Sequence, residues 1–242
     1  MNGETMMIRA VLFDLDGTLL PMNQDLFLKT YLKLLTAKLA GVGYDPTRVV
    51  PAVFKGTDAM IANDGKRINE DVFWENFCPA VGRDALLDCE VFEDFYAKEF
   101  DNARAVTKCE PMAKEIIDKL NGKGVVCVLA TNPVFPAVAT VHRIRWAGLQ
   151  PSDFALYTTF ENIGYAKPNP DYYREIISRL GLRPEECIMV GNDVDDDMVA
   201  EEVGIGVFLL TDNLINKSGK DISRYPSGDF SALAEFLDTV TG

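Results

Sequence analysis

Two aspartates, Asp14 and Asp16, stand on either side of one residue at the end of an apolar segment near the start of the chain. Residues two apart in an extended segment point to the same side, so both carboxylates can face one site, and Gly17 with Thr18 then allows a tight exit. One carboxylate could attack a phosphoryl group covalently, while the other protonates the leaving oxygen and later activates a water. Taken alone, the motif could equally be a turn or a metal-binding loop.

Further residues of the types that phosphoryl transfer requires follow later apolar segments. Thr131 offers a hydroxyl, Lys167 a cation, and Asp193 with Asp197 two more carboxylates. Negative charge spreads over the phosphoryl oxygens in the transition state, where a hydroxyl, an ammonium and a divalent cation stabilise it. Several carboxylates facing one point would also repel one another, and Mg²⁺, which prefers oxygen ligands, would relieve that repulsion. The set therefore predicts a magnesium-dependent site for phosphoryl transfer.

The elements that must position these residues alternate between strands and helices. Near-continuous apolar runs, typical of strands buried on both faces, precede the polar clusters at 9–15, 125–130, 186–190 and 205–210, with a weaker candidate at 154–158. Helical patterns that end at glycines cover 112–120, 137–147, 171–180 and 198–203. This alternation predicts a doubly wound parallel, Rossmann-like α/β sheet, in which ligands bind beyond the carboxyl ends of the strands.

The segment that follows the first polar loop has a different pattern. Apolar residues recur there at helical spacing without a convincing strand, which predicts an inserted all-helical cap. The expected domains are a catalytic α/β core formed by residues 1–20 and 106–242, and a helical cap formed by residues 21–105. Such a cap would close over Asp14, exclude water and select the leaving group.

Composition narrows the class of protein. The 242 residues carry a formal net charge of −13, which disfavours binding to nucleic acids or anionic membranes. No apolar run approaches the roughly 20 residues that cross a bilayer, and the start of the chain lacks the features of a signal peptide. The five cysteines are scattered, as expected of reduced thiols in the cytoplasm. We therefore expect a soluble cytoplasmic protein whose partner is a small molecule; its oligomeric state stays open.

In the order and context of these motifs, the chain resembles the haloacid dehalogenase superfamily of phosphohydrolases. The resemblance spans essentially the whole chain, because the helical insert looks like the family's type-one cap. The residues that carry it are Asp14-Leu15-Asp16-Gly17-Thr18-Leu19, Thr131-Asn132, Lys167-Pro168-Asn169-Pro170, and Gly191-Asn192-Asp193 with Asp197. It implies that Asp14 is the nucleophile, that Asp16 is the general acid and base, and that Thr131 and Lys167 bind the phosphate.

The resemblance also implies Mg²⁺ beside Asp14, bound by the backbone carbonyl of Asp16 and the carboxylate of Asp193. Many relatives begin the last motif with Gly-Asp, whereas here Gly191 is followed by Asn192. We favour Asp193 with Asp197 as the acidic pair, because four residues separate them, one turn at the start of a helix.

Other acids of the same motif have simpler explanations or lesser roles. Asn192 or Asp196 could act as an outer ligand of the metal. For Asp195 and Asp196, however, the stronger interpretation is that acids favour helix N-termini through the macrodipole.

Asp16 discriminates between activities within the superfamily. Family dehalogenases lack an acid at this position and P-type ATPases carry threonine, so hydrolysis of a phosphate monoester through an aspartyl phosphate is favoured. A sugar phosphomutase, which has the same acid, is the alternative. A receiver-type phosphoacceptor fits less well, because its acceptor aspartate lies on an internal strand and its chain is about half as long. A catalytically silent scaffold would more often have lost one of the motifs.

Further residues bear on substrate binding and on the core of the cap. We expect Asn132 to contact substrate beside Thr131. For Lys55, between helical stretches of the cap, an exposed lysine in a turn is the commoner explanation, and a substrate contact is the alternative. His142, the only histidine, is better explained by packing or surface exposure than by catalysis. Three aromatic residues at helical spacing are expected in the core of the cap: Phe73, Trp74 and Phe77.

Overall fold

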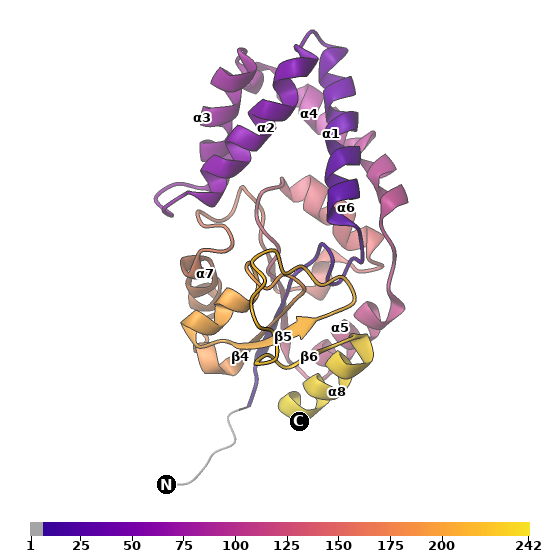
Figure 1. The fold of residues 1–242 in the computed structure, drawn as a ribbon, viewed down its shortest axis with the longest axis vertical. Coiled ribbons are helices and arrows are strands. Elements are labelled where there is room, and N and C mark those ends of the chain that lie inside the picture. Colours follow the sequence, from indigo (N-terminus) through magenta and orange to yellow (C-terminus); the bar gives the residue numbers. More distant parts are fainter. Residues whose placement is uncertain (1–6) are drawn as a thin grey trace.

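The computed structural model describes residues 7–242, in which a helical layer stands above an α/β layer (Figure 1). The α/β layer contains a six-stranded sheet in the order β3-β2-β1-β4-β5-β6, and every neighbouring pair is parallel. The strands are β1 (Ala10–Phe13), β2 (Val126–Leu129), β3 (Leu156–Tyr157), β4 (Cys187–Gly191), β5 (Gly206–Leu210) and β6 (Ser227–Gly228). The predicted α/β fold class is confirmed, while β6 was not predicted.

Helices cover both faces of this sheet, which explains why its strands read as continuous apolar runs. Alternate residues of β1 enter different hydrophobic clusters: Val11 and Phe13 pack with α5, α6 and α8, whereas Ala10 and Leu12 pack with α7. These helices are α5 (Pro111–Gly122), α6 (Ala137–Trp146), α7 (Pro170–Leu180) and α8 (Phe230–Thr241). Both faces of the central strand are therefore buried, and only its polar carboxyl end can contribute residues to a site.

Three short 3₁₀ helices complete this layer: η3 (Pro151–Asp153), η4 (Pro184–Glu186) and η5 (Met198–Val203). The predicted helix at 198–203 is thus a 3₁₀ helix rather than an α-helix. Gly204, at a φ of 92°, ends it after only six residues, and so short a segment gains little from α-helical hydrogen bonds.

The helical layer is built from α1 (Gln24–Ala40), α2 (Pro46–Ile61), α3 (Asn69–Val81), η1 (Ala85–Asp88), α4 (Cys89–Ala97) and η2 (Phe100–Val106). The chain enters and leaves it side by side, because Met22 forms a bridge with Thr107 and the Lys108 amide donates to the Pro21 carbonyl at 2.9 Å. This crossing lies near the predicted boundaries. The division into a core and a cap of residues 21–105 stays a prediction, and residues 1–6 lie outside the described part.

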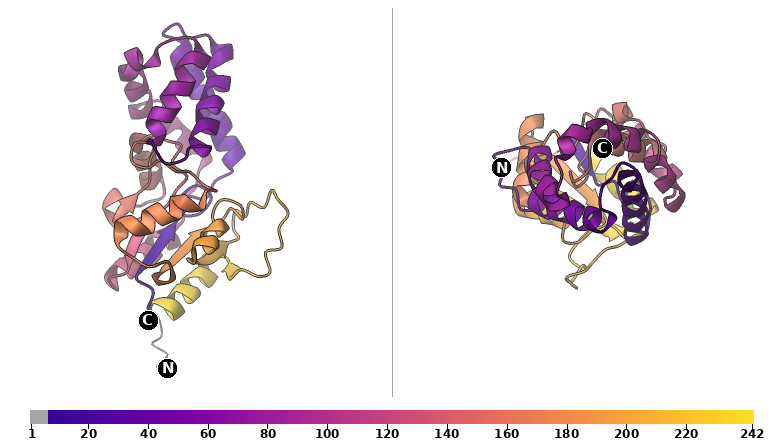
Figure 2. Two further views of the ribbon diagram at one scale, coloured as in Figure 1. Left: turned by 90° about the vertical axis from the view of Figure 1, so that its left-hand side faces the viewer. Right: turned by 90° about the horizontal axis from the view of Figure 1, so that it is seen from above.

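Aromatic side chains join the helical layer to the α/β layer. Phe100 of η2 stacks on Trp146 of α6 with ring centroids 5.1 Å apart, and Tyr31 of α1 meets Phe135 at 5.2 Å. On the other side, the backbone amide of Asn69, at the start of α3, donates to the Ile163 carbonyl at 3.0 Å. Figure 2 shows the helices standing over the sheet's polar end. The layer is therefore anchored on two sides of that end.

The cysteines and the apolar segments bear on the expectations drawn from composition. All five cysteines are free, and burial raises the pKa of Cys127 to about 12 and that of Cys187 to about 11, so neither is a reactive thiolate at neutral pH. Within residues 7–242, no helix combines the length and the apolar character needed to cross a membrane.

Candidate active site

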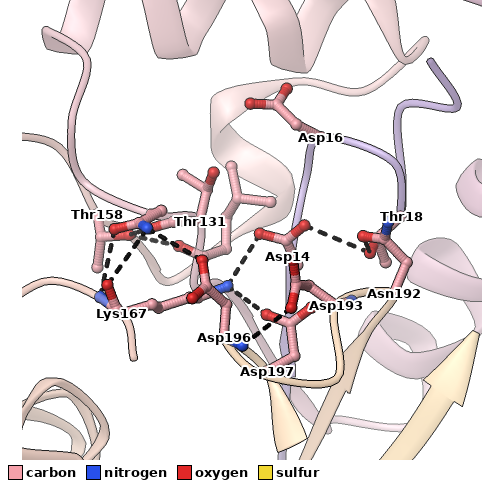
Figure 3. Close-up of polar contacts among 12 residues, drawn as sticks. Asp14, Asp16, Thr18, Thr131, Thr158, Lys167, Asn192, Asp193, Asp196 and Asp197 are labelled. Atoms are coloured by element: carbon pink, nitrogen blue, oxygen red, sulfur yellow. Dashed lines mark hydrogen bonds and ion pairs between the residues drawn. The ribbon is translucent and has the colours of Figure 1, made fainter. Parts of the chain in front are cut away.

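A pocket of about 240 Å³ lies at the carboxyl ends of β1, β2 and β4 (Figure 3). Its wall contains every predicted site residue except Lys55, namely Asp14, Asp16, Thr131, Asn132, Lys167, Asp193 and Asp197, and also Asp196. Parallel strands end at one edge of the sheet, so residues more than a hundred positions apart meet there. Gly17, at a φ of 91°, allows the loop after β1 to lie against the loop after β4. A Cβ at this position would lie 2.5 Å from the side chain of Asn192.

Asp14 and Lys167 form the buried centre of the pocket. Lys167 Nζ lies 2.9 Å from Asp14 Oδ1 and 2.6 Å from Asp197 Oδ1, and its side chain is 1% exposed. Burial alone would lower the pKa of Lys167, but the carboxylates of Asp14 and Asp197 outweigh it and hold that pKa well above its ordinary value. The ammonium is therefore charged beside the predicted nucleophile.

Thr131 and Asn132 are held by hydrogen bonds to the chain around them. The Thr131 carbonyl accepts from the hydroxyls of Thr158, at 2.6 Å, and Tyr172, at 2.8 Å. Asn132 Oδ1 accepts from the Lys167 amide at 3.2 Å, and Asn132 Nδ2 donates to Asp196 Oδ2 at 3.3 Å. Asn132 thus connects the end of β2 to the loop that carries Lys167.

Asp16 is oriented differently from the expectation. Its carboxylate is directed away from Asp14 in Figure 3 and forms an ion pair with Arg143 of α6. Asp14 and Asp16 both line the pocket, but the chain turns at once after Leu15, whose carbonyl accepts from the amides of Thr18, at 3.1 Å, and Leu20, at 2.8 Å. The alternation of an extended strand does not continue through such a turn.

Arg143 is a site residue that the sequence reasoning missed. It is fully buried, and its guanidinium also contacts the Thr140 hydroxyl at 3.2 Å and lies 4.3 Å above the ring of Phe135. The available signal was a charged residue one turn from Ala139 on the buried stripe of an amphipathic helix. A cation on an apolar stripe requires a buried partner.

The environment of Asp16 acts on its carboxyl group in opposing ways. Burial raises the pKa of Asp16 above its ordinary value, Arg143 opposes that rise, and the charge of Asp14 adds to it. Within residues 7–242, Asp16 Oδ1 is buried without a hydrogen-bond partner. A carboxyl group whose pKa is raised is suited to giving up a proton and taking one back.

The residues of the last motif have distinct tasks. Asn192 Oδ1 accepts from the Thr18 hydroxyl at 2.9 Å and its Nδ2 donates to the Asn213 carbonyl at 2.7 Å, so its amide is occupied in holding loops together. Asp193 Oδ1 accepts from the amides of Asp195, at 2.8 Å, and Asp196, at 3.1 Å. These contacts leave the second oxygen of Asp193 as the available ligand.

Asp197 is engaged through both of its oxygens. Oδ1 pairs with Lys167, and Oδ2 accepts from the Asp193 amide at 2.9 Å. Burial, with a further contribution from Asp14, raises the pKa of Asp197 to about 7 in spite of Lys167. These contacts make Asp197 the partner of Lys167, so its predicted role as a metal ligand gains no support from them.

The donor chemistry of the pocket fits a hard divalent cation. Six aspartates and two lysines line it, so a phosphate dianion would meet a strong excess of negative charge. Asp14 and Asp193 supply carboxylate oxygens of the type that Mg²⁺ prefers. The Asp16 carbonyl accepts from Gln24 Nε2 at 2.7 Å and would exchange that bond for the metal. Within the described chain, no three acidic, histidine or cysteine side chains are already gathered as a metal cluster.

Lys55 and His142 do not line this pocket. Lys55 lies inside α2 rather than in a turn between helices, its side chain is exposed, and it does not line the pocket; its substrate contact stays a prediction. His142 Nδ1 lies 3.6 Å from Asp101 Oδ1, and the imidazole packs against Phe100 and Trp146, with ring centroids 6.1 Å and 6.3 Å away.

Known proteins similar to the chain point to one family. The family model described as haloacid dehalogenase-like hydrolase matches residues 8–204. A phosphoglycolate phosphatase of Pectobacterium atrosepticum is 28% identical over 198 residues, covering 81% of this chain and 77% of that protein. One from Vibrio vulnificus is 26% identical and covers 96% of both chains. The crystal structure of a 2-haloacid dehalogenase from Pseudomonas syringae has a TM-score of 0.63 at 22% identity, covering 96% of this chain and 99% of that one.

Proposed function

We propose that this chain, which belongs to the haloacid dehalogenase-like hydrolase family and is a phosphatase, hydrolyses small-molecule phosphate monoesters through an aspartyl phosphate on Asp14. The observation that carries this proposal is the contact of Lys167 Nζ with Asp14, at 2.9 Å, and Asp197, at 2.6 Å, in a buried pocket. An ammonium fixed beside the nucleophile can also bind the transferred phosphoryl group. Charge arranged in advance in this way is the main requirement of phosphoryl transfer.

Two half-reactions use Asp14 and Asp16 in turn. Asp14 attacks the phosphorus in line with the ester oxygen, the bond from phosphorus to that oxygen breaks, and Asp16 gives its proton to that oxygen, which leaves as the alcohol. Water then attacks the phosphorus of the aspartyl phosphate and passes a proton to Asp16. Inorganic phosphate leaves, and Asp14 is regenerated as a carboxylate. Thr131 and Lys167 bind the phosphoryl oxygens in both steps.

Mg²⁺ enters the proposal as the cofactor, held by Asp14 and Asp193, where it supplies positive charge to the phosphoryl oxygens. The support for it is the excess of aspartates in the pocket wall. The proposed protein acts in the cytoplasm on a small-molecule ester and binds neither nucleic acid nor membranes. The formal net charge of −13 supports the exclusion of polyanionic partners.

Arg143 is assigned as a positioning residue for Asp16. Because the Asp16 carboxylate is directed away from Asp14, it has to rotate to reach the ester oxygen. The buried guanidinium stabilises the resting orientation and limits how far the pKa of Asp16 rises. Arg143 therefore acts on the reaction only through Asp16.

The test is phosphate release from p-nitrophenyl phosphate with Mg²⁺ or with EDTA. We expect turnover that requires Mg²⁺ and falls by at least about 1,000-fold in Asp14→Asn, since removal of a covalent nucleophile disables the whole pathway. Asp118→Asn, on the exposed side of α5, is the matched control and should retain full activity. Undiminished turnover in Asp14→Asn would contradict the proposal.

A further inference from the structure

A second cavity, of about 600 Å³, lies between the helical layer and the α/β layer, beside the catalytic pocket. The two share part of their walls, namely Leu28, Asn132, Val134 and Phe135. A substrate whose phosphoryl group meets Asp14 would therefore place the rest of the molecule in this cavity. Its lining, more than the catalytic residues, decides which alcohol can be accommodated.

The cavity is lined mainly by aromatic and aliphatic side chains. Phe73 and Trp74 of α3 are only partly buried and have ring centroids 5.1 Å apart, while Phe160 of the α/β layer lies 6.0 Å from Phe73. Phe77 is fully buried in the hydrophobic core, as expected, and Phe73 and Trp74 pack against the same core, while all three also line the cavity. Such a wall favours a flat apolar group.

The charged groups in this wall are all acidic. Among the described residues that line the cavity are three glutamates, Glu70, Glu93 and Glu161, and no lysine or arginine. Burial raises the pKa of Glu70, and the charge of Glu161 adds to the rise. The carboxylate of Glu161 is fixed by the backbone amide of Ala137, which donates to Oε1 at 2.8 Å and to Oε2 at 3.0 Å. An anionic leaving group would lose its water here without gaining a cation.

We propose that the substrate is a phosphate monoester whose alcohol carries a bulky apolar group, preferably aromatic, and no negative charge. This inference rests on the proposed function. It separates the chain from the relatives named phosphoglycolate phosphatases, because the glycolate part of that ester carries a carboxylate.

The experiment compares kcat/KM for four alkyl esters with Mg²⁺: 3-phenylpropyl phosphate, propyl phosphate, 3-(4-carboxyphenyl)propyl phosphate and phosphoglycolate. The first three break the same kind of bond, so differences between them report on the cavity. We expect kcat/KM to be about 100-fold higher for 3-phenylpropyl phosphate than for propyl phosphate. For 3-(4-carboxyphenyl)propyl phosphate, kcat/KM should be at least about 10-fold lower than for 3-phenylpropyl phosphate.

Two neighbouring leucines offer a matched pair of variants. Leu86 lines the cavity, whereas Leu87 does not, and both are exposed, at 52% and 83%, so that neither substitution should disturb folding. Leu86→Lys should bring the carboxylated ester to within about 3-fold of the uncharged one by supplying the missing cation. Leu87→Lys should leave the ratio of the two esters as in the wild type.

The outcomes distinguish this inference from the function on which it rests. Equal rates for the phenylpropyl and propyl esters, or phosphoglycolate as the best of the four, would overturn the substrate class while leaving the phosphatase intact. Turnover of neither these four esters nor p-nitrophenyl phosphate would overturn the proposed function and this inference with it.

Discussion

Replacing Lys167 with methionine should separate the stability of the site from its catalytic power. In the native protein Lys167 neutralises two buried carboxylates, at 2.9 Å from Asp14 and 2.6 Å from Asp197. Removing one partner of a buried ion pair leaves the other charge uncompensated, which costs about 3–5 kcal/mol of the free energy of unfolding. For a chain of this length that corresponds to a fall in Tm of about 6–20 °C.

A second substitution should restore stability but not activity. In Lys167→Met with Asp197→Asn, the most buried unpaired charge is gone, so at least about half of the lost free energy of unfolding should return. The phosphoryl group still lacks its ammonium, and kcat should stay at least about 100-fold below that of the wild type. Asp14 remains present in both variants.

Thermal unfolding and phosphate release, measured on the same preparations, provide the assay. Lys66→Met is the control, because Lys66 pairs with Asp64 on the surface and should affect neither measurement. Unchanged Tm in Lys167→Met would show that the buried ion pairs do not stabilise the fold. Recovery of kcat in the double variant would refute the assignment of Lys167 as a phosphate ligand.

Three further predictions concern the acid, the metal and pH. Arg143→Gln should lower kcat/KM for alkyl phosphates about 10-fold more than for p-nitrophenyl phosphate, because only poor leaving groups need the proton of Asp16. Arg143→Lys should restore part of this loss. Equal losses for the two kinds of ester would indicate a purely structural role of Arg143. Asp193→Asn should raise the half-saturating Mg²⁺ concentration at least about 10-fold, and unchanged activation by Mg²⁺ would argue against this ligand. The Arg183 amide, with the guanidinium groups of Arg183 and Arg9, lowers the pKa of Glu186 from 4.5 to about 2. Glu186 therefore stabilises the fold above pH 4.5 and loses that contribution as pH falls toward 2, so the stability deficit of Glu186→Gln should shrink over this range in acid unfolding; a constant deficit would contradict the assignment.

The sequence carried the information for the parallel sheet and its polar edge. Four strand segments and the weaker fifth were recognisable because burial on both faces makes them continuous apolar runs, as in β1. Strand β6, with only Ser227 and Gly228, has no such pattern and forms through pairing with the end of β5. Two residues are too few for any periodicity to be read.

Contacts that depend on distant packing were not predictable in the same way. The ion pair of Asp16 with Arg143 joins a turn after β1 to α6, and neither segment alone indicates the other. Likewise, the sequence allows Asn192 as an outer metal ligand, whereas in the structure its side-chain amide holds Thr18 and Asn213. The cavity beside the site is lined by segments from Leu28 to Glu161, so its acidic and aromatic character emerges only when the layers meet.

The most direct test of the central claim is to trap the covalent intermediate. The protein is mixed with a good ester and Mg²⁺, quenched within the first turnovers, reduced with borohydride and digested for mass spectrometry. Reduction of an acyl phosphate converts the aspartate to homoserine, and the account predicts this change at position 14, absent without substrate and absent in Asp14→Asn. Turnover with no modified aspartate, or with the modification at another residue, would contradict the account.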